Sequence, residues 1–352
     1  MSDQSPRLPA SSQSSNGRTR ARATRRSVDE RFGLDDFRRE LVGIVSFGAL
    51  IALLGAITPH LFPRTPVLHL DQARVHLGVG LLLCAFALGM LRAFRRAIAC
   101  AVAGFIMCAS VGLYALQHFA PQTPDRAADL SLISFNLLGD NPRGDDLAQF
   151  VIDSAPDIAV LLEAPAIHDQ RQELEDAFPY SAGCLTRPNG RLHCDLAVFS
   201  RLPLENIQAR PFYWIFGRLI TAEVVTEAGR ITLVAAHLGK PYWGDIHYDQ
   251  LAELARVLGE LDGPIILAGD FNSMPFVSAF RDSLHEQSGM KLASRMQTTW
   301  PALPSIALSN LGFAIDHVLV RGEATPVASE RLFDPIGSNH RGLLTRFDLD
   351  GI

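Results

Sequence analysis

The sequence contains very little lysine, and after residue 120 only Lys240 and Lys291 occur. In residues 121–352, 18 Lys and Arg residues stand against 30 Asp and Glu residues, which gives a net charge of −12. A protein that wraps a nucleic-acid duplex gains most of its affinity from basic side chains on phosphates. The composition therefore disfavours DNA as a partner of this part of the chain.

Cysteine is also sparse, with five residues in 352. Cys84, Cys100 and Cys108 lie in apolar stretches, where cysteine behaves as an ordinary small hydrophobic residue. Cys184 and Cys194 bracket a Pro-Asn-Gly turn signal, and their spacing does not suit zinc, which needs a close pair and further ligands. A cross-hairpin disulfide, which would persist only in an oxidising compartment, and two unpaired thiols both fit this pair.

Aliphatic side chains are nearly missing from residues 1–28, so this segment cannot bury enough surface to offset the entropy of ordering. We expect residues 1–40 to form a disordered, basic N-terminal arm. No aromatic residue interleaves with the arginines of residues 1–28. A solvated tail that guides membrane insertion is therefore favoured over a nucleic-acid-binding arm.

Charge is missing from long stretches of the N-terminal part. Residues 41–62 and 97–117 contain no charged residue, and residues 75–91 contain only His76 as a titratable group. A helix needs about 20 mostly apolar residues to cross a bilayer, so the first and third stretches qualify and the second is short. Such segments have no polar face to present to water. We predict a three-helix transmembrane anchor at residues 41–118, followed by a linker at 119–129.

Arginine is distributed unevenly around these stretches. Eight arginines lie within residues 18–39 and three within residues 92–96, whereas residues 63–74 hold only two. By the positive-inside rule, the N-terminus and the second turn are cytoplasmic. Three crossings of the cell (inner) membrane then place everything after residue 120 on its extracytoplasmic side.

From about residue 130, short aliphatic stretches alternate with helical patterns, which is typical of an α/β fold. We predict strands at residues 130–137, 157–163, 196–200, 219–225, 231–238, 264–271, 314–320 and 342–347, and helices at 145–155, 168–178 and 247–262. Polar residues stand at the ends of several of these strands. Strand ends that meet at one edge of a sheet can bring such groups into a single cleft.

Seven motifs occur in order in this region: "SFNLLGDN", "LLEAP", "FSRLPL", "AAHLGKP", "GDFNSMP", "IDHVLV" and "GSNHRGLL". The ordered set resembles the endonuclease/exonuclease/phosphatase superfamily, which includes DNase I-like nucleases, sphingomyelinases and inositol-polyphosphate phosphatases. The resemblance implies a catalytic domain at residues 130–352 with a four-layer α/β sandwich, in which helices flank two mostly antiparallel sheets. It also implies a metal-dependent hydrolase that acts on phosphoester bonds.

The resemblance assigns roles to the polar strand ends. Glu163 matches the carboxylate that holds a divalent metal, Mg²⁺ or Mn²⁺, and Asn136 matches the amide beside it. Asp270 matches the acid that accepts a proton from the attacking water, and Asn272 the amide that binds a phosphate oxygen. Without the other motifs, "GDFN" is typical of a plain turn. Without them, Glu163 is typical of an acid that begins a solvated loop.

Two histidines complete the set implied by the resemblance. His340 matches the histidine that contacts the scissile phosphate, and Asp316 the acid that orients it. His237 matches a second phosphate-facing histidine, and Arg218 a phosphate-binding arginine, although a salt bridge at the rim explains Arg218 equally well. Many family members have Asp where this chain has Asn339. An amide oxygen can also bind a metal, so the resemblance leaves open whether the site holds one metal ion or two.

The anchor and the motifs together predict a membrane-anchored, extracytoplasmic phosphoesterase that hydrolyses a phosphate ester or pyrophosphate, with a lipid-linked substrate as the leading interpretation. A membrane-anchored nuclease acting on extracellular DNA and an inactive binding module on the same fold are the alternatives. We predict the lipid bilayer as a partner and predict no protein partner. Aromatic residues in 210–219 and 240–248 could reach the membrane interface, but strand core is the better explanation for Phe212 to Phe216.

Overall fold

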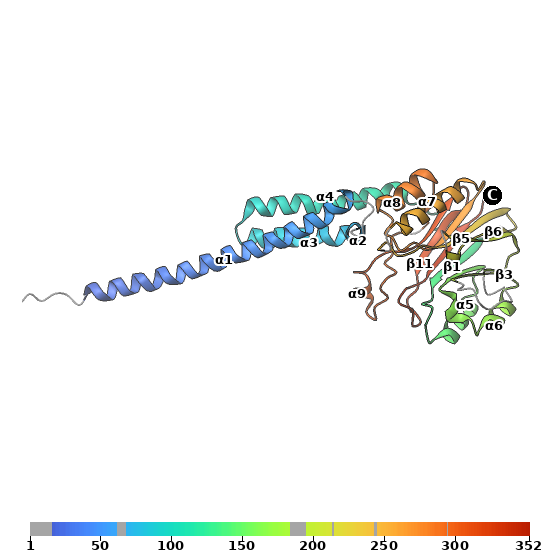
Figure 1. Ribbon diagram of the computed structural model, residues 1–352, viewed down its shortest axis with the longest axis horizontal. Helices are drawn as coiled ribbons and strands as arrows, with labels where there is room; N and C mark the ends of the chain where they lie inside the picture. The colour runs from blue at the N-terminus through green and yellow to red at the C-terminus, as the bar shows by residue number, and fades with distance from the viewer. Residues whose placement is uncertain (1–15, 62–67, 184–194, 213–214, 243–244, 294) are drawn as a thin grey trace, which may run out of the picture. The chain divides into compact units, whose positions relative to one another are not determined.

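The computed structural model of the protein (Figure 1) describes residues 16–61, 68–183, 195–212, 215–242, 245–293 and 295–352. By internal contacts the chain divides into two compact units. One comprises Met1–Leu53 and Val79–Phe105, and the other comprises Leu54–Gly78 and Ile106–Ile352. Cys184 and Cys194 lie outside the described residues, so the disulfide stays a prediction.

Apolar helices dominate the N-terminal part of the chain: α1 (Asn16–Leu61), α3 (Arg74–Met90) and α4 (Phe94–His118). Within the described ranges, the segments Gly33–Pro59 and Phe94–His118 are long and apolar enough to cross a membrane. We expected three such helices, but α3 has only 17 residues. At 1.5 Å per residue it spans about 26 Å, less than the roughly 30 Å of a hydrocarbon core.

The start of α1 differs from the disordered arm that we expected. Helical backbone begins at Asn16 and runs without interruption into the apolar segment. Arginine and alanine are good helix formers, and extending an existing helix needs no new nucleation. Ion pairs one turn apart, Arg38 with Asp35 at 3.9 Å and Arg39 with Asp36 at 3.4 Å, add a little support at the boundary.

The first sheet has the strand order β11-β12-β1-β2-β4-β3. Its strands are β1 (Leu130–Asn136), β2 (Ile158–Leu162), β3 (Tyr180–Gly183), β4 (Leu196–Ser200), β11 (Thr325–Arg331) and β12 (Leu343–Asp348). β1 and β2 are parallel and are joined through α5 (Gly144–Ser154), while the other neighbouring strands are antiparallel.

The second sheet repeats this plan with the order β5-β6-β7-β8-β10-β9. Its strands are β5 (Leu204–Phe212), β6 (Ile215–Val225), β7 (Arg230–His237), β8 (Ile265–Asp270), β9 (Lys291–Leu292) and β10 (Asp316–Arg321). Here β7 and β8 are the parallel pair, joined through α7 (Ile246–Gly259), and the other neighbours are antiparallel.

Helices cover the outer face of each sheet, which makes four layers. Figure 1 shows α5 and α6 (Arg171–Ala177) on one side of the sheets and α7 and α8 (Ser278–Phe280) on the other. Three apolar cores follow: one between the sheets, one under α5 and α6, and one under α7. Two mixed sheets flanked by helices fit the α/β sandwich that we predicted.

Short elements complete the described chain: α2 (Leu68–Gln72), η1 (Ala164–Ile167), η3 (Arg281–Gln287) and α9 (Ile306–Ser309). All eight predicted strands and all three predicted helices of this domain are confirmed, with shifts of a few residues at their ends. β3, β5, β9 and β11 were not predicted. The residues of β5 and β11 are mostly half-buried or exposed and lack an apolar alternation, and β3 and β9 have only four and two residues. Phe212 is fully buried at the end of β5, as expected for strand core.

The register brings the polar strand ends to one edge of the molecule. In the second sheet, His237 pairs with Asp270, and Asp270 pairs with Asp316 on its other side. In the first sheet, Asn136 ends β1 beside Leu162, the last residue of β2, and Glu163 follows. Because the sheets pack face to face through a shared core, these groups converge.

Candidate active site

A cleft of about 460 Å³ opens at this edge. Six of the predicted site residues line the cleft: Glu163, His237, Asp270, Asn272, Asn339 and His340. Lys240 also lines it. The lining also includes the apolar side chains of Tyr242, Trp300, Phe313 and Ile315. The cleft therefore combines charged side chains with an aromatic lip.

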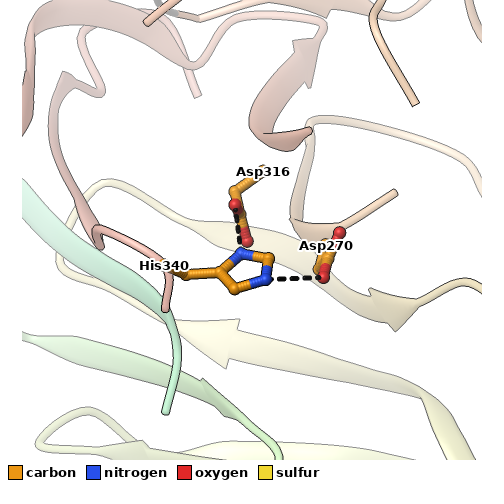
Figure 2. Close-up of side chains that lie close together, drawn as sticks. All are labelled: Asp270, Asp316 and His340. Atoms are coloured by element: carbon orange, nitrogen blue, oxygen red, sulfur yellow. Dashed lines mark hydrogen bonds and ion pairs between the residues drawn. The ribbon is translucent and has the colours of Figure 1, made fainter. Parts of the chain in front are cut away.

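His340 and Asp316 form a buried pair at the base of the cleft (Figure 2). The Nδ1 atom of His340 lies 2.8 Å from Oδ2 of Asp316, so the other ring nitrogen, Nε2, points toward Asp270 at 3.9 Å. The Ser338 hydroxyl accepts the His340 N–H at 3.0 Å and donates to the Asn136 carbonyl at 2.7 Å. This contact ties the histidine loop to the end of β1, which fixes the ring in place.

A second histidine approaches Asp270 from the other side. The Nε2 atom of His237 lies 3.7 Å from Oδ2 of Asp270, and its Nδ1 atom forms a short contact with Asp195. Asp195 was not among the predicted residues. It stands at the start of β4, which is antiparallel to β2, and thus lies at the same sheet edge as the C-terminal end of β2. The sequence signal for Asp195 is an acid directly before a predicted strand, whereas the predicted site residues lie mainly at C-terminal strand ends.

Arg218 binds this second acid and does not line the cleft. Its Nη2 donates to Oδ1 of Asp195 at 3.2 Å, and its side chain is only 16% exposed. The salt bridge that we considered as the alternative for Arg218 is therefore present. Arg218 belongs to β6, the neighbour of β7, whereas His237 and Asp270 end β7 and β8. The arginine therefore lies one strand away from these two residues, behind His237.

Asp270 is enclosed by hydrogen-bond donors and is 1% exposed. Its Oδ1 accepts the backbone N–H of Asn272 at 2.8 Å, and its Oδ2 accepts from Nδ2 of Asn136 at 3.0 Å. Asn272 has a positive φ of 48°, and its side-chain Nδ2 donates to the Leu238 carbonyl at 2.8 Å. The "GDFN" segment is thus a turn, and two of its residues, Asp270 and Asn272, line the cleft.

The charges around the cleft shift several pKa values. Burial, followed by the negative charge of Asp316, raises the pKa of Asp270 to about 6. Burial by itself lowers the pKa of His340, but the charge and hydrogen bond of Asp316 outweigh it and raise the pKa to about 9. At neutral pH, His340 is therefore a cation and Asp270 is largely ionised.

His237 and Asp195 shift each other in the same manner. Burial opposes the charged form of His237, but Asp195 outweighs burial and raises the pKa of His237. Burial likewise opposes ionisation of Asp195, but His237 and then Arg218 lower the pKa of its carboxyl. Two histidine rings, each held by its own carboxylate, consequently flank Asp270. His340 is cationic and Asp195 favours the charged form of His237, an arrangement that suits an anionic ligand.

The oxygen atoms in the cleft fit a hard divalent ion, which prefers oxygen ligands. Asp270, Asp316 and His340 each have a ligand atom within 4.8 Å of the others, and Oδ1 of Asp316 is buried with no hydrogen-bond partner in the described part of the chain. The Glu163 carboxylate accepts the Gly139 N–H at 2.7 Å and also lines the cleft. These residues could therefore hold a metal ion.

The two asparagines proposed as metal ligands differ in their arrangement. Asn136 directs Nδ2 to Glu163 at 3.2 Å and to Asp270, while its Oδ1 accepts the Leu138 N–H at 3.1 Å. As oriented, Asn136 links the two carboxylates and does not present an oxygen to an ion. Asn339 is exposed on the cleft wall, and its side chain can still reach an ion.

A sequence profile of the endonuclease/exonuclease/phosphatase family matches residues 133–340. The fold is similar to that of an endonuclease/exonuclease/phosphatase from Bacteroides vulgatus, with 19% identity and a TM-score of 0.50 over 64% of this chain and 100% of that one. It is also similar to D. rerio TDP2 humanized by 14 mutations, with 18% identity and a TM-score of 0.51 over 62% of this chain and 98% of that one.

A third similar structure is D. rerio TDP2 complexed with single strand DNA product, with 17% identity and a TM-score of 0.50 over 62% of this chain and 98% of that one. No curated protein matches the sequence. At these identities, the likeness to the solved structures concerns the fold.

Proposed function

Because the chain belongs to the endonuclease/exonuclease/phosphatase family, it is a hydrolase of phosphoester bonds, and we propose that its substrate is a lipid-linked phosphate ester or pyrophosphate at the extracytoplasmic membrane surface. The observation that carries this proposal is the composition of the cleft. Histidines and carboxylates line the cleft together with aromatic side chains, of which Tyr242 and Trp300 form an exposed lip. A phosphate joined to an apolar group matches both kinds of side chain.

The lip supports the proposal further because it continues into exposed apolar side chains. Trp300 is 37% exposed and Tyr242 is 48% exposed at the cleft, and Leu303, Leu308 and Leu311 follow on the same segment as Trp300. Contiguous exposed apolar groups commonly mark a membrane or partner contact. A bilayer surface would cover them and present the substrate.

Membrane anchoring rests on the two long apolar helices. Their most apolar windows are only 6% buried for Gly33–Pro59 and 22% buried for Phe94–His118. The core helix of a soluble protein would be mostly buried, so an apolar solvent is the natural environment of these side chains. The arginine distribution favours a cytoplasmic N-terminus and an extracytoplasmic catalytic domain.

Asp270 is the proposed base: it accepts a proton from water as the water oxygen attacks phosphorus and the bond to the leaving oxygen breaks. Its pKa of about 6 leaves it ionised at neutral pH yet able to take up the proton. His340 and His237 stabilise the added negative charge on the phosphoryl oxygens, and Asn272 orients one of them. Asp316 keeps the His340 ring cationic, Asp195 favours the charged form of His237, and both carboxylates fix the rings in place.

The family is generally dependent on a divalent metal. We propose Mg²⁺ or Mn²⁺, held by Glu163, which lines the cleft together with Asn339. When bound, the ion would polarise a phosphoryl oxygen and neutralise the leaving oxygen.

The proposed substrate is tested with the purified full chain in detergent and Mg²⁺. Phospholipid vesicles, a polyprenyl pyrophosphate and plasmid DNA are offered separately, and Asp270→Asn serves as the inactive control. Release of phosphate or head group from a lipid, without cleavage of the plasmid, is the expected result. Nicked plasmid without lipid hydrolysis would establish the nuclease alternative, and silence on all substrates the binding module.

The nuclease alternative is favoured by one specific observation. D. rerio TDP2, whose fold is similar, is complexed with single strand DNA product. Lys240 in the cleft could bind a nucleic-acid backbone. The net charge of −12 over residues 121–352 argues against a duplex substrate.

The proposed orientation has a separate test. A phosphatase reporter that is active only outside the cytoplasm is fused after Ile352, and a second copy is fused within residues 92–96. Activity of the first fusion alone is expected. Activity of a cytoplasm-specific reporter at Ile352 would reverse the orientation.

A further inference from the structure

The segment that joins the first two apolar helices contacts the catalytic turn. α2 ends at Gln72, whose side chain is 7% exposed and lines the cleft. The Nε2 atom of Gln72 donates to the Asn272 carbonyl at 3.2 Å. Its Oε1 atom accepts the Met274 N–H at 3.3 Å. The Gln72 amide thus binds two backbone groups, one on either side of Ser273. Asn272 is 200 positions from Gln72 in the sequence and Met274 is 202 positions away.

This contact imitates the pairing of a β-strand. The carbonyl of one residue and the N–H of the residue two positions later face the same side of an extended segment, and a neighbouring strand would bind both. No strand follows β8 at this point, because the chain turns at Asn272. The side chain of Gln72 takes the place of the missing strand and leaves neither buried group unsatisfied.

The turn needs such support because of its conformation. Asn272 has a φ of 48°, in the left-handed region that residues other than glycine rarely occupy. Its side chain is held by the Leu238 carbonyl, and the Ser273 carbonyl accepts from Nε2 of His317 at 2.9 Å. Gln72 is a further clamp on this turn: it binds the backbone carbonyl of Asn272, whose N–H is held by Asp270.

Gln72 is in turn held by contacts of the residues around it. Asp71, which is 3% exposed, accepts from Nε of Arg74 at 3.0 Å. The Arg74 guanidinium lies over the ring of Phe276 at 5.2 Å, and Nε2 of His76 contacts the Leu311 carbonyl at 2.7 Å. The segment is therefore held directly after Gln72, through the contacts of Arg74 with Phe276 and of His76 with Leu311.

We infer that Gln72 is a positioning residue, which holds the backbone of Asn272 so that its amide meets the substrate phosphate. The inference rests on the phosphate-binding role proposed for Asn272. It makes the segment between the first two apolar helices part of the catalytic machinery. A chain that begins after α4 would lack this clamp, even though it keeps every motif of the family.

The activity test uses the full chain in detergent, with bis(4-nitrophenyl) phosphate and Mn²⁺ as soluble probes. Gln72→Ala is expected to lower kcat about ten-fold and to leave KM within about two-fold, because misplaced contacts act mainly on the transition state. In an Asn272→Ala background, the same change is expected to lower kcat less than about two-fold. An equal loss in both backgrounds, or no loss in either, overturns the inference.

Hydrogen exchange of residues 270–277 gives a readout that does not depend on turnover. Gln72→Ala is expected to speed exchange of the Met274 N–H about ten-fold, and unchanged exchange overturns the inference even if the probe is not hydrolysed. The matched control is Gln122→Ala, which removes a similar bond from a glutamine Nε2 to the Ala293 carbonyl at 3.3 Å and should leave this peptide unchanged. If Gln72→Ala does not fold, Gln72→Glu takes its place. Glutamate keeps the acceptor for the Met274 N–H but loses the donor to the Asn272 carbonyl, so kcat should fall about three-fold. A wild-type kcat in Gln72→Glu overturns the inference.

Discussion

At the scale of single residues, the site depends on two histidines that are each paired with a carboxylate. His340 with Asp316 was expected from the sequence, whereas the partner of His237, Asp195, was found only in the structure. Both pairs act on the same acid, Asp270, through Nε2 atoms at 3.7 and 3.9 Å. Changes at either pair should therefore affect the same step.

The first prediction concerns Asp316→Asn. The pKa of His340 is raised to about 9 against the opposing effect of burial, chiefly by Asp316, so removal of this charge should lower it. Because the cationic ring is the active form, the alkaline limb of kcat/KM should move to lower pH by at least about one unit. The pH profile measures the shift, with the exposed Asp350→Asn as control.

The sign for stability follows from the same pKa. His340 is more easily protonated in the folded protein than in the unfolded chain, so its charge stabilises the fold below about pH 6.5, and this stabilisation is lost as the pH rises through about 9. Asp316→Asn should remove that dependence from the free energy of unfolding. An alkaline limb that does not move would show that a different group titrates there.

The second prediction concerns Asp195→Asn. His237 and Arg218 are both buried or nearly so and share this carboxylate, so its neutralisation removes the anion that Arg218 binds and leaves His237 with the more distant Asp270 at 3.7 Å. We expect unfolding free energy to fall by about 3 kcal/mol and kcat by about 100-fold. Denaturant titration and initial rates measure the two effects. Glu330→Gln, which breaks a surface pair with Arg346 at 3.5 Å, should change stability by less than about 0.5 kcal/mol.

The third prediction concerns the metal ligand. Glu163→Gln removes the charge of a carboxylate that lines the cleft, so the Mn²⁺ concentration for half-maximal rate should rise more than about ten-fold. Chelation with EDTA should abolish the activity of the wild type, and added Mn²⁺ should restore it. Asp140→Asn changes an exposed acid nearby and should leave the metal requirement unaltered. Activity that survives EDTA would rule out the metal.

At the scale of elements, the spacing of β7 and β8 sets the distance between His237 and Asp270. Gly269 faces Ala236 across this parallel pair, and it has a φ of 153°. A Cβ atom on Gly269 would lie 1.8 Å from the Ala236 carbonyl oxygen. No side chain fits there, so the glycine allows the two strands to approach closely next to the catalytic residues.

The fourth prediction is that Gly269→Ala separates β7 from β8. It should lower the free energy of unfolding by about 3 kcal/mol, and in any folded fraction it should reduce kcat, because Asp270 moves away from His237. Thermal unfolding and initial rates test this. Gly259→Ala, at the end of α7 with open space around it, should leave stability the same or raise it by up to about 1 kcal/mol. Equal stability of both variants would contradict the prediction.

The elements themselves were largely readable in the sequence. Apolar runs such as residues 231–238 and 264–271 predicted β7 and β8 because buried strands need continuous aliphatic surface. β5 was missed because an edge strand with one well-exposed stretch carries no such pattern. The apolar run predicted at residues 75–91 and α3 have the same length of 17 residues, so the sequence already showed that this segment is short for a crossing.

At the scale of the whole molecule, the structure divides one continuous chain into two compact units whose boundaries fall within α1, α3 and α4. The boundary that we drew from composition, at residue 118, separates the anchor from the catalytic domain. The contacts instead assign Leu54–Gly78 and residues 106–118 to the unit that holds the sheets. The segment with Gln72 therefore belongs to the catalytic unit despite its apolar neighbours in sequence.

The sequence by itself determined eight of the strands, the three domain helices and the residues at the strand ends, because periodicity and turn residues are local properties of the chain. Through the ordered motifs it also predicts which side chains carry the chemistry. Only the tertiary structure decided that Asp195 orients His237, that Arg218 lies behind it and that Gln72 clamps the catalytic turn. Those contacts join residues up to 202 positions apart, and which residues meet depends on how the sheets and helices pack, which no local pattern encodes.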